Sequence, residues 1–273
     1  MNKTFTQTIF LNFRDFIYQN YGIYYSDVKK ELLKLKIDRC MLRAKVDSYD
    51  AYFALIKNTK DTSYLNDFID EITVNKTEFF REIEHYHYIQ ENIGKILKEN
   101  PNILKNKEIK VWSMACSTGQ EAYTCAMILK EVLPPEIRIR ILATDISNRV
   151  LRIAKVGIYP QEFKSDIPNI YLKKYFKEQQ HYIELSKTIK DMVVFRKFNL
   201  IDSFPFEGMF DIVFCKNVMI YFKLETQQQL IDKIYQYLSP GGLFLIGQSE
   251  SLLNKNHLFE HIKSTIYIKP SSG

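Results

Sequence analysis

The sequence has few of the residues that build metal centres or disulfide frameworks. Its five histidines have no acidic or cysteine partners at a metal-binding spacing. Its four cysteines match neither a disulfide scaffold nor a Cys-x-x-Cys pair; they are Cys40, Cys116, Cys125 and Cys215. We therefore expect no metal site, and we expect the cysteines to be buried side chains in a reducing cytoplasm.

The chain also lacks long hydrophobic runs. No stretch reaches the roughly 18 apolar residues that a membrane-spanning helix needs, and the N-terminal segment MNKTFTQTIF lacks the charged-then-apolar pattern of a secretory signal. We expect a cytoplasmic protein without membrane insertion. The net charge of +6 is too small to demand a nucleic-acid partner. With 273 residues and 46% hydrophobic content, the chain can fill the cores of one large α/β domain and one small helical domain.

Residues 109–122, IKVWSMACSTGQEA, change from a buried-strand pattern to a helical pattern across a turn of small residues. Such a turn points main-chain N–H groups and a helix N-terminus at the strand end, where nucleoside ligands bind in open α/β sheets. The turn lacks GxGxxG, whose glycines let the main chain approach a pyrophosphate, and this disfavours a dinucleotide. A ligand without phosphates, such as S-adenosylmethionine (SAM), suits it better.

A second predicted strand, within residues 137–147, ends at Asp145. A carboxylate in this position can accept hydrogen bonds from a ribose diol. An aspartate after a strand is also common in α/β proteins that bind no nucleoside. Together, the small-residue turn and Asp145 indicate a nucleoside site.

Residues 6–72 have the periodicity of helices at 6–20, 27–45, 48–58 and 61–72. One sector of the second helix is apolar. A separate sector, about 80° wide, is cationic and carries Lys29, Lys36, Arg39 and Arg43. This face can be an ordinary solvated surface or a docking surface for an acidic partner, and the pattern leaves both open.

Residues 74–97 are expected to form a further helix, capped by Thr77 and with Glu78 in its first turn. Arg81 in that turn would be poorly placed against the helix dipole. An anionic group bound near Arg81 would compensate for this placement.

The remaining sequence alternates strands and helices at short spacing, which predicts right-handed crossovers and a parallel sheet. A helix over 120–132 ends at Pro134 and Pro135, and Ser147 is expected to cap the next helix. Short alternating runs within 171–196 are interpreted as a small antiparallel β insertion. One further strand is expected to end at 198–202, and the next is expected within 210–222, where an apolar run at 212–214 ends in Cys215, Lys216 and Asn217. Another strand is expected to follow a turn at 240–242, and the last strand, 264–268, is expected to be antiparallel. The predicted class is α/β, with a Rossmann-like seven-stranded sheet behind an all-helical N-terminal domain.

Seven segments in order resemble the chemotaxis receptor methyltransferases, the CheR family. They are NKTEFFR (75–81), WSMACSTGQEAY (112–123), ATDIS (143–147), GIYP (157–160), FNL (198–200), FDIVFCKNVMIYF (210–222) and PGGLFLIGQSESL (240–252). The resemblance implies a class I SAM-dependent methyltransferase domain over 74–273 and a basic receptor-docking domain over 1–73. It implies methyl ester formation on glutamate side chains in the cytoplasmic helices of chemoreceptors, for adaptation in chemotaxis, with S-adenosylhomocysteine as the product.

The resemblance also implies roles for particular residues. The implied cofactor contacts are Asn75, Thr77, Arg81, Glu121, Asp145, Asn199, Leu200, Lys216 and Asn217. Tyr221 would lie beside the methyl-transfer centre, and we expect Arg81 and Tyr221 to orient the donor and the incoming carboxylate. The cationic sector of Lys29, Lys36, Arg39 and Arg43 would hold the acidic methylation region of the receptor.

Three features depart from the family pattern. Lys216 stands where arginine is usual, which makes a bidentate contact a single one. Gln120 stands where an acidic residue is common, so Glu121 carries that charge alone. Residues 171–196 contain no glycine, whereas members that tether to a receptor C-terminal pentapeptide carry a glycine-rich loop there; we do not expect this tether.

Two other functions are compatible with parts of the pattern. A basic front domain on a SAM-binding fold would also suit a nucleic-acid methyltransferase, but amino-group methylation usually shows Pro-Pro-aromatic where this chain has Lys216, Asn217 and Val218. A non-catalytic SAM-responsive binding module is the other alternative, and the completeness of the motifs disfavours it.

Overall fold

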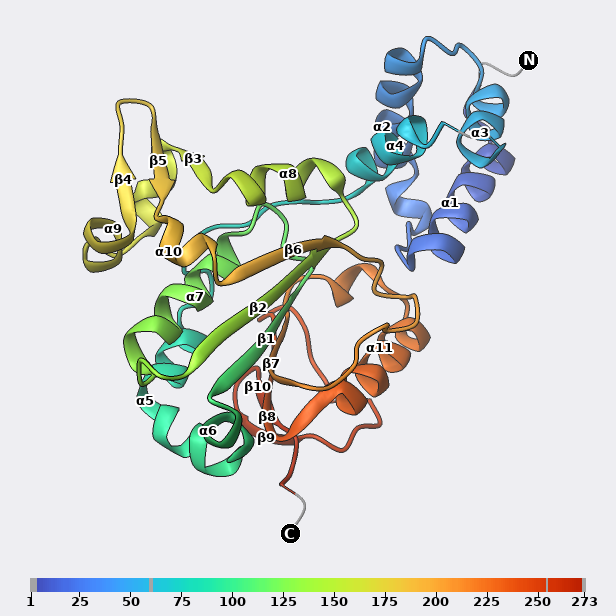
Figure 1. Ribbon diagram of the computed structural model, residues 1–273. Helices are drawn as coiled ribbons and strands as arrows, with labels where there is room; N and C mark the ends of the chain where they lie inside the picture. The colour runs from blue at the N-terminus through green and yellow to red at the C-terminus, as the bar shows by residue number, and fades with distance from the viewer. Residues whose placement is uncertain (1–3, 59–60, 254, 272–273) are drawn as a thin grey trace.

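The computed structural model describes residues 4–58, 61–253 and 255–271 and begins with a group of helices (Figure 1). These are α1 (Gln7–Tyr21), the 3-10 helix η1 (Asp27–Lys29), α2 (Lys30–Ala44), α3 (Tyr49–Asn58) and α4 (Ser63–Ile72). Thr6 caps α1 by accepting the N–H of Ile9 at 3.2 Å, and Gly22 ends it with φ 72°. The core of this group is aromatic and includes Phe13 and Phe68. The four expected helices are confirmed, and the division of the chain at residues 73 and 74 stays a prediction.

A seven-stranded sheet forms the centre of the rest of the chain, in the order β6-β2-β1-β7-β8-β10-β9. Five strands run parallel: β1 (Glu108–Met114), β2 (Arg138–Asp145), β6 (Val193–Lys197), β7 (Phe210–Cys215) and β8 (Leu238–Ile246). β10 (Ile266–Ile268) is antiparallel to β8, and β9 (Glu260–Lys263) is antiparallel to β10. The Rossmann-like sheet with an antiparallel end is confirmed, although β9 was not expected as a strand.

Side chains that alternate along the central strands build a core on each face of the sheet. On one face, Val111 and Phe214 belong to the core covered by α5 (Glu84–Glu99), α7 (Gln120–Val132) and α8 (Asn148–Val156). On the other, Trp112 and Val213 pack with α11 (Leu224–Tyr237). Figure 1 shows these helices on opposite sides of the sheet. The shorter helices are α6 (Asn102–Asn106), η2 (Gln161–Asp166), α9 (Asn169–Tyr175), α10 (Lys187–Lys190) and η3 (Met219–Tyr221).

The small antiparallel sheet exists, but not within the predicted bounds. Its strands are β3 (Ile158–Pro160), β5 (Tyr182–Leu185) and β4 (Phe176–Glu178), in that spatial order. The insertion predicted at 171–196 therefore begins too late and ends too late. Its last run is β6, which pairs with β2 in the large sheet. The run alternates because β6 is an edge strand: Val193 and Phe195 are buried, whereas Val194 is 46% exposed.

Three other expectations need correction. Residues 198–202 form a loop after β6 instead of ending a strand, and the turn at 240–242 lies inside β8. Helix α5 begins at Glu84, so Thr77 does not cap it and Arg81 does not lie in its first turn. Residues 79–83 form turns instead, with φ 55° at Phe80 and 56° at Glu82. On a helix, the side chains of Phe79 and Phe80 would point about 100° apart. The turn lets both of them enter the core, where both are buried.

Candidate active site

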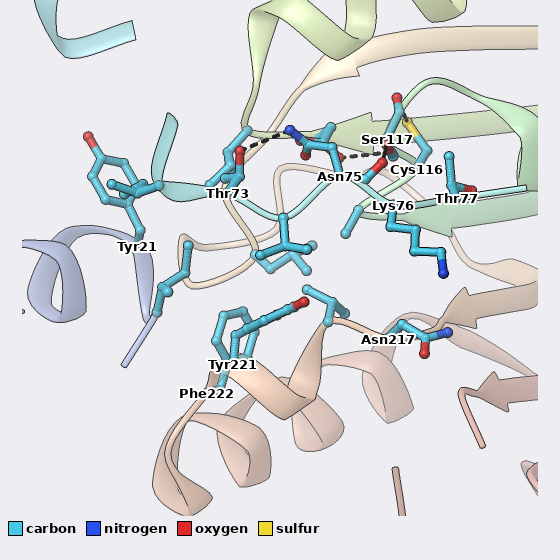
Figure 2. A pocket seen from close by; sticks show the side chains of 18 of the residues that line it. Tyr21, Thr73, Asn75, Lys76, Thr77, Cys116, Ser117, Asn217, Tyr221 and Phe222 are labelled. Carbon is cyan, nitrogen blue, oxygen red and sulfur yellow. Dashed lines mark hydrogen bonds between the residues drawn. The ribbon is translucent and has the colours of Figure 1, made fainter. Parts of the chain in front are cut away.

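A pocket lies at the carboxyl ends of β1, β2, β6 and β7, between this edge of the sheet and the N-terminal helices. It encloses about 1220 Å³, counting the part that is open to solvent. Figure 2 shows residues 73–77 and 116–117 on one wall, with Asn217, Tyr221 and Phe222 opposite. Every residue predicted to contact the cofactor lines this pocket: Asn75, Thr77, Arg81, Glu121, Asp145, Asn199, Leu200, Lys216 and Asn217. Tyr221, Lys29 and Lys36 line it as well.

The turn between β1 and α7 forms one wall through an unusual main-chain path. Ala115 and Ser117 both have φ 50°, and Gly119 has φ 93°. A Cβ on Gly119 would lie 3.0 Å from the Cβ of Ala154, so both the conformation and the packing favour glycine here. Left-handed residues other than glycine cost about 1 kcal/mol or more each, and they concentrate at functional sites.

Asp145 holds this turn from the end of β2. Its two carboxylate oxygens accept the N–H of Ser117 and the N–H of Ser147, both at 2.9 Å. Burial raises the pKa of Asp145, which is 7% exposed. Each carboxylate oxygen has two lone pairs, so Asp145 retains acceptor capacity for hydroxyl groups inside the pocket.

The segment that connects the helical domain to the sheet packs against this turn and belongs to the same wall of the pocket. The hydroxyl of Ser117 donates to the carbonyl oxygen of Asn75 at 2.8 Å, and the Asn75 amide donates to Thr73 at 3.2 Å (Figure 2). The pocket wall is therefore continuous from the end of α4 to the β1 turn.

A cluster of one buried cation, Lys216, and two carboxylates forms part of the pocket wall and extends behind it. The ammonium group of Lys216 lies 3.4 Å from Glu121 and 3.3 Å from Glu82, and it donates to the carbonyl oxygen of Arg81 at 3.0 Å. Lys216 thus meets each carboxylate through a single contact. Burial acts to raise the pKa of Glu82, but Lys216 and the groups that donate to Glu82 outweigh it, and the pKa is lowered. Glu121 also accepts the hydroxyl of Ser113 at 2.7 Å.

Asn217, Arg81 and Tyr221 lie together at the end of β7. The Arg81 guanidinium donates to the side-chain oxygen of Asn217 at 3.0 Å, and the Asn217 amide donates to Glu82 at 3.2 Å. Asn217 has φ 59°, which turns the chain sharply after the strand. Burial raises the pKa of Tyr221 further above neutral. Its protonated hydroxyl points into the pocket and can donate there.

The helical domain closes the pocket by direct main-chain contacts. The N–H of Tyr24 donates to the carbonyl oxygen of Tyr221 at 2.8 Å, and Ile23 forms an antiparallel bridge with Phe222. The Asn199 amide donates to the carbonyl oxygen of Asn20 at 2.7 Å. The conformation around Tyr221 therefore depends on both parts of the chain.

The structure divides the four cationic residues of the second helix. Lys29 is exposed and lines the pocket, while Lys36 lines it and donates to the carbonyl oxygen of Glu71 at 2.5 Å. Burial lowers the pKa of Lys36. Arg39 and Arg43 lie beyond the pocket and pair with acidic residues of α4, Arg39 with Glu71 at 3.2 Å and Arg43 with Asp67 at 2.9 Å. Ion pairs within the helical domain thus partly neutralise the charges of Arg39 and Arg43.

Sequence reasoning missed two carboxylates that organise this site, Glu82 and Glu250. Glu250 accepts main-chain N–H groups from the loop that carries Asn217. Glu250 lies inside the segment PGGLFLIGQSESL, and Glu82 directly follows the segment NKTEFFR. No spacing rule marks them, because their partners are distant in sequence.

Comparison with protein-family models identifies the family of this chain. A model described as the CheR methyltransferase SAM binding domain matches residues 75–268, and one described as the CheR methyltransferase all-alpha domain matches residues 9–73. The chain belongs to the CheR methyltransferase family. The cofactor that its large domain binds is SAM.

Relatives share most of their length with this CheR-family chain. A chemotaxis protein methyltransferase of Borreliella burgdorferi is 36% identical over 93% of this chain and 91% of its own length. Chemotaxis protein methyltransferase 2 of Vibrio cholerae is 32% identical over 98% of this chain and 95% of its own length. The chemotaxis protein methyltransferase of Escherichia coli is 30% identical over 92% and 87%. Within the described residues, no helix is long and apolar enough to cross a membrane.

The residues of the pocket fit SAM chemically. Asp145 suits the ribose diol, and the apolar side chains of Ile146 and Leu200 line the pocket with it, where an adenine ring could pack. Arg81 suits a carboxylate such as that of the methionyl group. Glu121, which forms an ion pair with Lys216, suits an ammonium group or hydroxyls.

Proposed function

We propose that this CheR-family methyltransferase forms methyl esters on glutamate side chains in the cytoplasmic helices of chemoreceptors. The observation that carries the proposal is that one pocket is lined both by the residues expected to contact SAM and by Lys29 and Lys36 of the helical domain. A carboxylate attracted to these cations would enter beside Tyr221. The names of the relatives agree with a role in chemotaxis, and the site of action would be the cytoplasm.

The reaction needs alignment rather than acid or base catalysis. A glutamate with a pKa near 4.3 is more than about 99% ionised at pH 7. SAM supplies a methyl group on a sulfonium; a bond from that carbon to a carboxylate oxygen forms as its bond to sulfur breaks, and no proton moves. We assign to Arg81 and Tyr221 the orientation of the reacting groups, because Asn217 holds the Arg81 guanidinium and the Tyr221 hydroxyl points into the pocket. The helical domain covers part of the same space, and a bound receptor helix would exclude water from the rest.

The exposed face around α2 suits an amphipathic, acidic helix. Beside its cationic side chains it exposes apolar ones: Leu32 is 47% exposed and Leu35 is 55% exposed. An acidic helix with an apolar stripe could pair with both kinds of side chain. We do not expect a pentapeptide tether, because residues 158–196, which include the small sheet, contain no glycine.

The direct test is incubation of the purified protein with methyl-labelled SAM and membranes from the same cell. We expect base-labile methyl ester on a membrane protein. Label on RNA or DNA instead would establish the nucleic-acid alternative. Tight SAM binding without transfer to any receptor fragment would favour the non-catalytic binding module.

The docking face is tested by variants of η1 and α2. Changing Arg39 and Arg43 to alanine together, or Lys29 to alanine, should raise the KM for receptor and weaken its salt dependence. Changing Lys30 and Lys34 to alanine removes the same charge as the double arginine variant. These two lysines lie outside the cationic sector, where they bind Gln7 and Asp38, and their loss should leave the KM near wild type. Equal rates and equal salt dependence in all variants would defeat the docking assignment.

A further inference from the structure

Glu250 is a buried carboxylate whose four hydrogen bonds all come from main-chain N–H groups. One oxygen accepts from Asn217 at 2.9 Å and from Gly247 at 2.7 Å. The other accepts from Val218 at 2.9 Å and from Met219 at 2.7 Å. Glu250 is 8% exposed and is not among the residues that line the pocket.

Only an ionised carboxylate can satisfy this set of donors. It offers about four lone-pair sites and no hydrogen, whereas a glutamine of the same shape would aim its NH₂ group at two of the N–H donors. The close approach also needs Gly247, because a Cβ there would lie 2.8 Å from the Asn217 nitrogen and 2.9 Å from a Glu250 oxygen.

The loop that Glu250 holds carries two residues of the candidate active site. Asn217 has φ 59°, and its side chain contacts both Arg81 and Glu82. The same loop leads into η3, which carries Tyr221. Three consecutive N–H groups, those of residues 217–219, are thereby fixed to one side chain.

The turn is held from its carbonyl side as well. The Gln227 amide donates to the carbonyl oxygens of Met219 at 2.8 Å and Phe222 at 3.0 Å. Gln248, between Gly247 and Glu250, donates its N–H to Glu82 at 3.0 Å, so the same segment also reaches the partner of Lys216. The position of Tyr221 is thus set by these contacts together with the hydrogen bond from Tyr24 to its carbonyl oxygen.

We propose that Glu250 is a positioning residue for methyl transfer, which holds Asn217 and the Tyr221 turn in the geometry that the reaction needs. The assignment rests on the proposed function. Glu250 acts through Asn217 and Tyr221 and does not itself contact the reacting groups.

The test compares Glu250→Gln with Asp211→Asn. Asp211 is a matched control, since it is also a buried carboxylate and accepts three hydrogen bonds. It lies at the start of β7, away from the loop that follows this strand. It accepts from the N–H of Lys110 at 2.8 Å and from the side chains of Asn100 at 2.7 Å and Ser239 at 3.1 Å. The measurements are the affinity for S-adenosylhomocysteine by calorimetry, kcat and the KM for receptor, and the melting temperature.

We expect both variants to melt at lower temperature and only Glu250→Gln to lose function. Its kcat should fall at least tenfold and its affinity for S-adenosylhomocysteine about tenfold, with the KM for receptor unchanged. Glu250→Asp, which keeps the charge on a shorter side chain, should fall between it and wild type. If Glu250→Gln does not fold, Glu250→Asp decides the question by the same readouts.

Wild-type kcat and affinity in folded Glu250→Gln, or losses shared equally with Asp211→Asn, would overturn the assignment. If the proposed receptor methylation is wrong, the experiment gives a different result. In that case wild type transfers no methyl group to receptors, while the affinity for S-adenosylhomocysteine still falls only in the Glu250 variants.

Discussion

The ammonium group of Lys216 lies 3.3 Å from the carboxylate of Glu82, and both side chains are nearly inaccessible, at 2% and 9% exposure. Glu121 lies 3.4 Å from the same ammonium group and is 14% exposed. The single cation therefore compensates two carboxylates at the pocket wall. Such an arrangement is sensitive to the loss of one partner, because a buried charge without compensation is strongly unfavourable.

Replacing Lys216 by methionine should lower the free energy of unfolding by about 3–5 kcal/mol, because two buried carboxylates lose their cation. Urea unfolding measures this change. Lys187→Met is the control, since Lys187 pairs with Asp191 at the surface, where the side chains are 83% and 59% exposed, and it should cost less than about 1 kcal/mol. Equal losses in the two variants would contradict the role of Lys216.

His85 should make the protein less stable as the pH falls below neutral. Burial, with the nearby charge of Lys216, lowers the pKa of His85 to about 4. Between pH 6.5 and 4 the unfolded chain binds the proton and the folded chain does not, so the free energy of unfolding falls across this window. The loss from this residue amounts to at most about 3 kcal/mol.

His85→Gln should flatten this pH dependence, as measured by urea unfolding at several pH values. The exposed His87 on the same helix provides the control, and His87→Gln should keep the wild-type slope. A slope that survives in His85→Gln would assign the proton uptake to another group.

Asp145→Asn should weaken the binding of S-adenosylhomocysteine by about 10- to 100-fold, which corresponds to the loss of one or two charge-assisted hydrogen bonds. The asparagine would also direct its NH₂ group at the N–H of Ser117 or Ser147, both of which now donate to the carboxylate. Calorimetry measures the affinity. Asp211→Asn makes the same change far from the pocket and should bind with wild-type affinity.

Tyr221→Phe should reduce kcat about tenfold, equivalent to about 1.4 kcal/mol of transition-state stabilisation. The ring and the main-chain contact with Tyr24 stay, so the turn should keep its position. The measurement is the rate of methyl transfer at saturating SAM, with Tyr182→Phe in the small sheet as the control. Unchanged turnover would remove the hydroxyl from the mechanism.

The predicted cofactor residues come together because of a simple geometric rule. The carboxyl ends of parallel strands meet at one edge of a sheet, so residues that follow β1, β2, β6 and β7 must lie near each other. Asp145 was singled out from the end of a predicted strand, and the resemblance added Asn217 after a later one; both line the pocket. The motif resemblance also added Asn75, which no periodicity would have selected. Arg81 was singled out by an expected helix, and the structure has a turn there instead.

Other features could not be predicted because they depend on partners distant in the chain. β6 was assigned to the small sheet, since a short alternating run does not show which sheet it joins. The turn at residues 79–83 was taken for helix, because only the packed core shows that Phe79 and Phe80 are both buried. The pairing of Arg39 and Arg43 with α4 likewise has no signal within α2.

The sequence by itself determined the alternation of strands and helices, the small-residue turn after β1 and the polar residues at the strand ends, because these depend on local periodicity and residue type. Only the tertiary structure decided which charges are shared and which loops are held. Lys216 donates to a carbonyl group 135 residues away, and Glu250 accepts from N–H groups 31 to 33 residues away. Hydrogen bonds and burial over such separations arise from packing, which leaves no periodic trace in the chain.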